Sequence, residues 1–159
     1  MGVEIERKFL VDRMVWHPER ANGKRYRQGY LSSEPGCTVR VRIAGQQGFL
    51  TIKGATHGIE RLEFEYSVPL ADAEQLLSEL CHQPLIEKTR YREPWAGLIW
   101  EVDVFEGDNA GLIVAEIELP SAGTHFDRPP WLGVEVSHDP RYFNAALARN
   151  PWSRWGKGT

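Results

Sequence analysis

Glu4, Glu6 and Lys8 stand at alternate positions in the stretch Gly2-Val3-Glu4-Ile5-Glu6-Arg7-Lys8-Phe9-Leu10-Val11. If this stretch is a β-strand, the three side chains share one face, because successive side chains of a strand point to opposite faces. Two carboxylates at positions i and i+2 are about 6.6 Å apart and repel by about 2.5 kcal/mol at an effective dielectric constant near 20. Such a pair is expected either to face water or to share a cation.

Charged side chains with the same spacing recur along the rest of the sequence. The acidic members are Glu4, Glu6, Glu63, Glu65, Glu101, Asp103, Glu116 and Glu118, and the basic members are Lys8, Arg40, Arg42, Lys53, Arg61, Lys88, Arg90 and Arg92. Pairs of carboxylates bind hard divalent cations such as Mg²⁺ and Mn²⁺. Clusters of arginine and lysine bind oxygen-rich anions, of which phosphate is the first candidate. A cation together with a polyphosphate indicates metal-assisted phosphoryl chemistry.

The segments that carry these charges alternate between charged and apolar residues, which predicts strands. Besides the first stretch, we expect strands over 24–33, 37–44, 49–54, 59–68, 85–93, 98–105, 112–119 and 134–136. Apolar residues at helical spacing predict a helix over 70–82. The pair Asp139-Pro140 suits the start of a second helix, over 140–149.

Two arrangements of such strands remain open. In an ordinary antiparallel sheet, one face is apolar and the other is solvated. In a closed or nearly closed barrel turned inside out, the charges line the interior and the apolar faces lie outside, under the two helices. Like-charged pairs such as Arg40 with Arg42 favour the barrel, because they repel one another unless opposite charges lie between them.

The composition is that of an ordinary globular protein, with 159 residues of which 42% are hydrophobic and 26% charged. We expect a single domain over residues 1–159. The net charge of −3 provides no overall basic field, so nucleic acid is not an expected partner. No secretory signal follows Met1, and no apolar run approaches the roughly 20 residues of a membrane helix, so we expect a cytoplasmic protein without a membrane partner. Cys37 and Cys81 suit a reducing compartment, and a disulfide between them is not expected.

Taken in order, the charged segments resemble the motifs of the CYTH domain family, the triphosphate tunnel metalloenzymes. Glu4-Ile5-Glu6-Arg7-Lys8 is similar to the ExExK signature of that family, and Arg40-Val41-Arg42 to the paired arginines of its third strand. The further matches are the lysine strand at 51–53, R-x-E-x-E at 61–65, K-x-R at 88–90, E-x-D at 101–103 and E-x-E at 116–118. Residues 131–136 and 139–142 resemble the C-terminal part of short bacterial members. ExExK alone arises often by chance, whereas the ordered set is specific.

The resemblance implies an α+β fold that is mostly β: an eight-stranded antiparallel closed barrel, or tunnel, with a charged interior and a few covering helices. It implies a requirement for Mg²⁺ or Mn²⁺ and a small-molecule triphosphate as the partner, and it leaves a homodimer open by analogy. The implied metal ligands are Glu4, Glu6 and Glu118, then Glu116 and Asp103, with Glu63, Glu65 and Glu101 for a second metal or for orienting water. The implied phosphate ligands are Lys8, Arg40, Arg42, Lys53, Lys88, Arg90 and Arg61, the last of which is alternatively a charge partner for the acids.

The expected catalytic residues are Lys8, Lys53, Glu63 and Tyr30, where Tyr30 either packs or points inward to assist protonation of the leaving group. The implied activity is hydrolysis of a triphosphate, first of all inorganic tripolyphosphate, because a chain this short favours a small substrate. The alternatives are a class IV adenylate cyclase, a thiamine triphosphatase and, outside the enzymes, a polyphosphate- or nucleotide-binding module. The five histidines, His17, His57, His82, His125 and His138, lack metal-ligand spacing and are expected at the surface.

Overall fold

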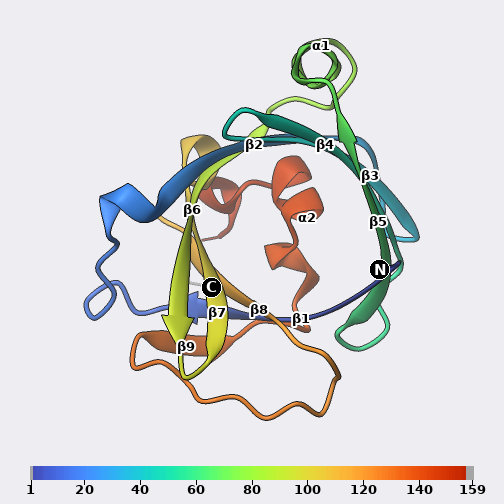
Figure 1. Cartoon of the computed structure of the whole chain (residues 1–159). Coiled ribbons are helices and arrows are strands. Elements are labelled where there is room, and N and C mark those ends of the chain that lie inside the picture. The colour runs from blue at the N-terminus through green and yellow to red at the C-terminus, as the bar shows by residue number, and fades with distance from the viewer. Residues whose placement is uncertain (1, 157–159) are drawn as a thin grey trace.

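A curved antiparallel sheet and two α-helices make up the computed structural model, which describes residues 2–156 (Figure 1). The strands are β1 (Gly2–Val11), β2 (Gly23–Glu34), β3 (Cys37–Ala44), β4 (Gln47–Gly54), β5 (Glu60–Val68), β6 (Ile86–Trp95), β7 (Leu98–Phe105), β8 (Ile113–Glu118) and β9 (Leu132–Glu135). The helices are α1 (Leu70–Glu79) and α2 (Asn144–Arg149), with 3₁₀ turns at Arg20–Asn22, Gly107–Asn109, Pro140–Tyr142 and Trp152–Arg154. All the predicted strands are confirmed, and no strand end differs from its predicted position by more than two residues.

β1 closes the sheet into a barrel because it pairs with two strands of the same sheet. Residues Gly2 to Ile5 lie antiparallel to β5, and residues Glu6 to Leu10 lie antiparallel to β8. The order around the barrel is β1-β5-β4-β3-β2-β6-β7-β8, so the predicted eight-stranded antiparallel barrel is confirmed. β9 is an additional strand beside the end of β1.

The alternation of side chains along each strand decides what fills the barrel. On β3, Arg40 lines the interior cavity, whereas its neighbour Val41 is fully buried on the outer side against α1. On β1, Lys8 faces inward and Phe9 packs on the outer side with Trp100 and Trp131. The charged interior and the apolar exterior therefore arise from the same period of two.

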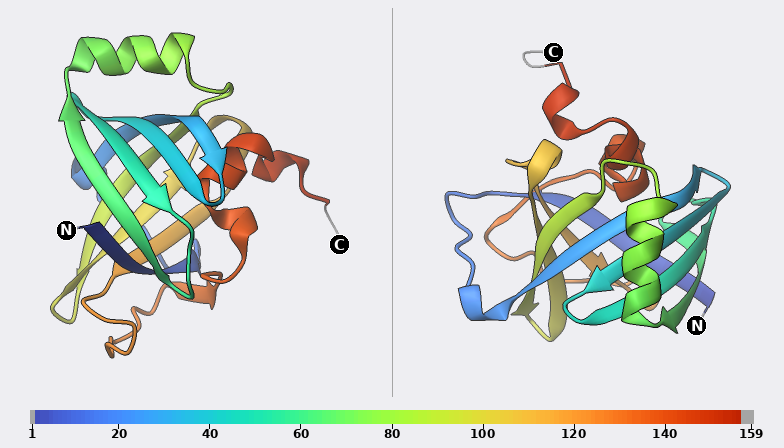
Figure 2. Two further views of the ribbon diagram at one scale, coloured as in Figure 1. Left: turned by 90° about the vertical axis from the view of Figure 1, so that its right-hand side faces the viewer. Right: turned by 90° about the horizontal axis from the view of Figure 1, so that it is seen from above.

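α1 covers the outer face of β3 and β4, as predicted, although it ends at Glu79 instead of at residue 82 (Figure 2). Its buried residues Ala73 and Leu77 pack against Val41 of β3. Gly48 permits this close approach, because a Cβ atom there would lie 2.8 Å from the Cβ of Ala73. Around β1, β7 and β8 the cover consists of loops, which contribute Trp16 and Trp131 to the apolar cluster outside the barrel.

The prediction of a helix over 140–149 that covers an outer face is wrong in both extent and place. Phe143 has an extended backbone (φ −68°, ψ 138°), which separates the turn at Pro140–Tyr142 from α2. α2 lies across one end of the barrel (Figures 1 and 2). There, Leu147 is fully buried against an apolar layer that includes Tyr30. An apolar helix stripe fits an inner layer as well as an outer one, so its periodicity could not distinguish the two.

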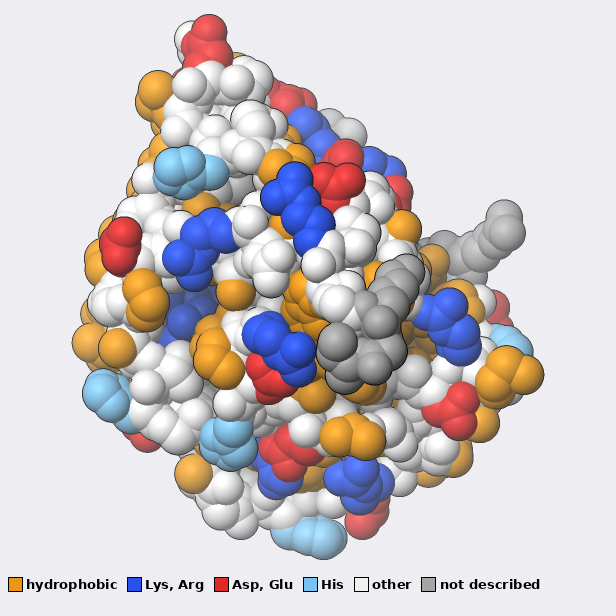
Figure 3. Space-filling view, turned by 180° about the vertical axis from the view of Figure 1, so that it is seen from behind, with side chains coloured by type: hydrophobic (Ala, Val, Ile, Leu, Met, Phe, Trp, Pro, Cys, Tyr) orange, Lys and Arg blue, Asp and Glu red, His pale blue; other side chains and the backbone are white. Residues whose placement is uncertain are grey.

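The positions of the histidines and the cysteines can be compared with the expectations from the sequence. The five histidines are exposed, and Cys37 and Cys81 are free cysteines. Within the described residues 2–156, no helix combines the length and the hydrophobicity that a membrane crossing requires. On the face that Figure 3 shows, lysine and arginine side chains are interspersed with acidic and hydrophobic ones, so neither sign of charge dominates it.

Candidate active site

A cavity of about 720 Å³ occupies the interior of the barrel, and the turns after β2 and β4 and the C-terminal segment also line it. The predicted site residues that line this cavity are Tyr30, Lys8, Lys53, Lys88, Arg40, Arg42, Arg61, Arg90, Glu4, Glu6, Glu63, Glu65, Glu101, Glu116 and Glu118. Asp103 lies behind this lining, where Lys88 and Arg90 cover it. Arg92 does not contribute to the wall and is exposed. The structure therefore brings together residues from all eight barrel strands.

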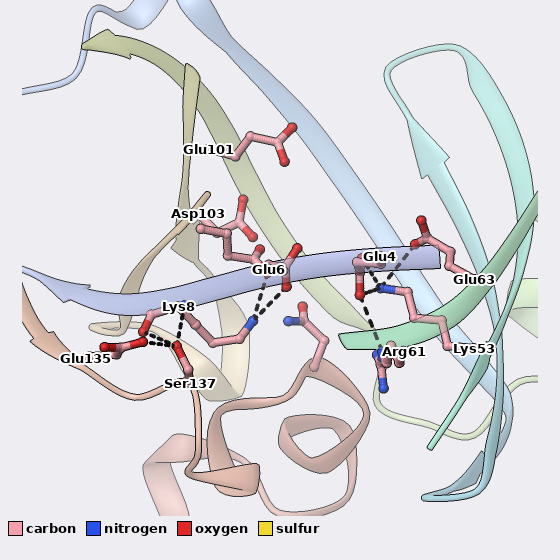
Figure 4. A network of polar contacts seen from close by, with 12 residues as sticks. Glu4, Glu6, Lys8, Lys53, Arg61, Glu63, Glu101, Asp103, Glu135 and Ser137 are labelled. Atoms are coloured by element: carbon pink, nitrogen blue, oxygen red, sulfur yellow. Dashed lines mark hydrogen bonds and ion pairs between the residues drawn. The ribbon is translucent and has the colours of Figure 1, made fainter. Parts of the chain in front are cut away.

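Carboxylates from β1, β5 and β8 meet at one part of the wall. Oxygen atoms of Glu4, Glu63 and Glu118 lie within 4.8 Å of one another. The register between β1 and β8 pairs Glu6 with Glu118, and Glu6 borders the same space (Figure 4). Carboxylate oxygens at this spacing are the ligands that Mg²⁺ and Mn²⁺ prefer, so the residues present fit a hard divalent cation.

Burial and neighbouring charges shift these carboxyl groups in different directions. Burial, Glu116 and Glu4 raise the pKa of Glu6 well above its ordinary value. Burial and the charge of Glu4 also raise the pKa values of Glu63 and Glu118. The cluster therefore contains carboxyl groups that hold protons more firmly than usual, as expected where like charges crowd together without a cation between them.

Glu4 is the exception in this cluster. Burial alone would raise its pKa, but Lys53 and Arg61 outweigh burial and lower it. The Lys53 ammonium donates to Oε2 of Glu4 at 3.0 Å, and Arg61 Nε donates to Oε1 at 3.4 Å (Figure 4). Glu4 therefore stays ionised beside neighbours that favour protonation.

A second part of the wall carries cations that the acids do not neutralise fully. Arg42 has no carboxylate within 4.0 Å among the described residues, unlike Arg40 and Arg90. Burial, Arg40 and Arg90 lower the pKa of Arg42 to about 10. The buried Nε of Arg40 has no hydrogen-bond partner. A guanidinium that lines a cavity without a carboxylate partner, as that of Arg42 does, is an arrangement that a bound anion would complete.

Two further buried carboxylates, Asp103 and Glu116, have cations as partners, as Glu4 does. Asp103 accepts from the Lys88 ammonium at 2.7 Å and from Arg90 Nε at 2.7 Å. Glu116 accepts from the Lys8 ammonium at 2.8 Å and from Arg90 at 3.1 Å. Burial would raise the pKa of each acid, but these cations lower both. The geometry makes the two carboxylates counter-ions of the basic lining, and their role as metal ligands stays a prediction.

Lys88 has the most complete burial of the basic residues in the site. Burial lowers its pKa to about 7, although Asp103 opposes this shift. Arg90 and Arg42 add to the lowering. The charge of Lys88 is therefore expected to change near neutral pH, unlike that of an ordinary lysine.

The sequence prediction missed several polar residues of the wall. The missed residues with cavity-lining or buried polar contacts are Tyr26, Gln28, Thr38, Thr51, Ser137 and Asn144. Gln28 and Thr51 stand two positions before Tyr30 and Lys53, so the strand period was a signal that would have found them. Ser137 and Asn144 reach the cavity from the C-terminal segment, for which the sequence has no local signal of an interior position.

Comparisons with known proteins agree with the arrangement of the strands and charges. The family model described as CYTH domain matches residues 2–144. A protein named inorganic triphosphatase from Acetivibrio thermocellus is 46% identical over 155 residues, which cover 98% of this chain and 99% of that protein. A second protein of that name, from Nitrosomonas europaea, is 37% identical and covers 91% and 96% of the two chains. A crystal structure of an inorganic triphosphatase superposes with a TM-score of 0.65 at 36% identity, over 91% of this chain and 97% of the other.

Proposed function

This chain belongs to the CYTH domain family, and we propose that it is a divalent-metal-dependent triphosphatase that hydrolyses inorganic tripolyphosphate inside the barrel. The observation that carries the proposal is that one cavity joins a cluster of carboxylates to Arg42, which has no carboxylate partner among the described residues. The names of two relatives, each matched over more than nine-tenths of its length, support the same activity.

The carboxylate cluster is the proposed metal site. Glu4 and Glu118 of this cluster and the adjacent Glu6 hold the cation, Mg²⁺ or Mn²⁺. Glu63, the third carboxylate of the cluster, is available for a second ion or for water, as are Glu65 and Glu101. When bound, the metal supplies positive charge next to phosphate oxygens and makes a coordinated water more acidic. Glu63 is the proposed acceptor of a proton from the attacking water, since it lines the cavity next to Glu4 and Glu118.

The basic lining is the proposed phosphate site. Lys8, Arg40, Arg42, Lys53, Arg61, Lys88 and Arg90 bind the oxygens of the triphosphate. The water oxygen attacks the terminal phosphorus, the bridging P–O bond breaks, and phosphate and pyrophosphate are the products. Tyr30 is the proposed proton donor to the leaving group, since it lines the cavity and Gln28 donates to its hydroxyl oxygen at 3.2 Å.

A substrate panel tests the proposed activity. Purified protein is incubated with tripolyphosphate, thiamine triphosphate, ATP or GTP and with Mg²⁺ or Mn²⁺, and both phosphate and cyclic nucleotide are measured. We expect phosphate release from tripolyphosphate and loss of that activity in a chelator. Cyclic AMP from ATP would instead support an adenylate cyclase, and tight binding without turnover under either cation would support a binding module.

Metal binding is expected to release protons and to become tighter as the pH rises. The pKa values of Glu6, Glu63 and Glu118 are raised, so in mildly acidic solution a cation competes with protons for these carboxyl groups. Titration calorimetry with Mn²⁺ at about pH 5.5 and about pH 8, in buffers of different ionisation enthalpy, measures both effects. Equal affinity at the two pH values, with no proton release, would contradict the metal site.

We also propose that the chain acts as one domain and that two copies associate through the uncovered outer face of β1 and β5. Val3, Leu62, Phe64 and Tyr66 are 48%, 54%, 43% and 57% exposed on this face. A contiguous apolar area of this kind is typical of an interface. These four side chains carry no charge, so they can meet the same four side chains of a second copy without electrostatic repulsion. Sedimentation is expected to show a dimer that Phe64→Lys dissociates. A monomeric unsubstituted protein would refute the proposed dimer.

The location of the protein is proposed from its cysteines. The two free cysteines support a cytoplasmic location.

A further inference from the structure

Gln28 of β2 is fully buried between α2 and the cations of the cavity. Its Oε1 accepts from Arg42 Nε at 2.8 Å, and its Nε2 donates to Asn144 Oδ1 at 3.1 Å and to the Tyr30 hydroxyl at 3.2 Å. Because a guanidinium only donates, the amide oxygen must face Arg42, and the amide nitrogen must then face Asn144 and Tyr30. The orientation of this buried amide is therefore fixed by its partners.

Asn144 is the first residue of α2, and its amide is fixed in the same way. Its Oδ1 accepts from the Lys88 ammonium at 3.0 Å as well as from Gln28. The Gln28 amide nitrogen only donates, and so does Lys88 in its charged form, so both contacts require the oxygen of Asn144 and exclude its nitrogen. One carbonyl oxygen of the C-terminal segment thus contacts Lys88 directly and Arg42 through Gln28.

We propose that Asn144 is a positioning residue that holds Lys88 and, through Gln28, Arg42 in the orientation that binds a tripolyphosphate chain. This inference rests on the proposed function, since it assigns both cations to substrate binding. It makes α2 a part of the phosphate site, although the CYTH domain match ends at residue 144.

Two observations separate this role from simple attachment of the helix. Leu147 is fully buried in the apolar layer at the barrel end and anchors α2 independently of Asn144. Arg42 has no carboxylate partner among the described residues, so the Gln28 oxygen is the acceptor that orients its Nε. When the Asn144 oxygen is removed, the Gln28 amide nitrogen loses one of its two acceptors and keeps only the Tyr30 hydroxyl, so Gln28 holds Arg42 less firmly.

The test replaces Asn144 by leucine, which has a similar volume and no acceptor. We expect the Kd of tripolyphosphate, measured by calorimetry in a chelator, and the KM in Mg²⁺ to rise about tenfold, as for the loss of one charge-assisted contact. The kcat is expected to change by less than about threefold, because the loss affects binding more than the chemical step. Asn150→Leu is the matched control, since Asn150 is exposed just beyond α2 and its side chain is outside the cavity wall.

A double-mutant cycle measures the coupling between Gln28 and Asn144 in tripolyphosphate binding, which a purely structural role of Asn144 would not produce. Gln28→Leu and Asn144→Leu interrupt the same connection to Arg42, so their effects on Kd are expected to be clearly less than multiplicative. Multiplicative effects would overturn the connection through Gln28. If the leucine variant is not folded by circular dichroism, Asn144→Ala is used, which removes the acceptor and adds no atoms.

The outcomes distinguish this inference from the proposed function. If the unsubstituted protein binds and hydrolyses tripolyphosphate and a folded Asn144→Leu protein has the same Kd and KM, the positioning role is overturned and the function stands. If the unsubstituted protein neither binds nor hydrolyses tripolyphosphate, the proposed function fails and the inference fails with it. A tenfold change in Asn144→Leu without a change in Asn150→Leu supports both.

Discussion

Replacing Glu6 by glutamine is expected to reduce metal-dependent tripolyphosphate hydrolysis by roughly 10²-fold or more while the protein remains folded. A bound metal contributes several kcal/mol of charge stabilisation to the transition state, and each 1.36 kcal/mol corresponds to about a factor of ten in rate. The raised pKa of Glu6 indicates that its carboxyl group is readily protonated without a metal, and a glutamine resembles that neutral form. Its salt bridge is also long, 3.9 Å to Lys8, so little stability depends on it.

The comparison of Glu6→Gln with Glu4→Gln makes this prediction sharper. Glu4 is the counter-ion of Lys53 and Arg61, so its replacement is expected to reduce both the activity and the unfolding free energy. Glu6→Gln is expected to reduce the activity and the Mn²⁺ affinity alone. Glu19→Gln, at an exposed position in the loop before β2, is the control for loss of one carboxylate. Near-normal turnover in both Glu4→Gln and Glu6→Gln would contradict the assignment of these carboxylates as metal ligands.

The charged interior could be predicted from the sequence because a strand has a period of two and like charges need partners. Two like charges on one strand face, such as Glu4 with Glu6 or Arg40 with Arg42, repel one another unless an opposite charge lies nearby. A closed barrel is an arrangement that provides this opposite charge. The order of the motifs then gave the number of strands by resemblance to a family. These parts depend on local spacing, which the sequence displays directly.

The C-terminal contribution could not be predicted because it depends on tertiary contacts. Asn144 shows no periodic signal, and its approach to Lys88 depends on α2 lying across the end of the barrel. Asp103 illustrates a second difficulty. Its position in an E-x-D pair predicts a metal ligand as readily as a counter-ion, and the contacts to Lys88 and Arg90 become visible only in the folded chain.

Asp103→Asn is expected to lower the unfolding free energy by about 3 kcal/mol, near the lower end of the 3–5 kcal/mol typical of breaking a buried ion pair. The substitution keeps the size of the side chain but leaves Lys88 and Arg90 without their shared negative charge. The pKa of Lys88, already about 7, allows this lysine to lose its proton, which moderates the cost. Urea denaturation at neutral pH measures the difference, with Asp108→Asn, at an exposed position, as the control.

The pH dependence and the response to ligands separate the counter-ion role of Asp103 from a metal-ligand role. The pKa of Asp103 is lowered in the folded protein, so its contribution is present above the unfolded value of about 3.9 and is lost as the pH falls through the folded value. The stability gap between the two proteins should therefore narrow in acid. Tripolyphosphate should stabilise Asp103→Asn more than the unsubstituted protein, because the anion replaces the missing negative charge beside Arg90. A variant with unchanged stability but much weaker Mn²⁺ binding would instead identify Asp103 as a metal ligand.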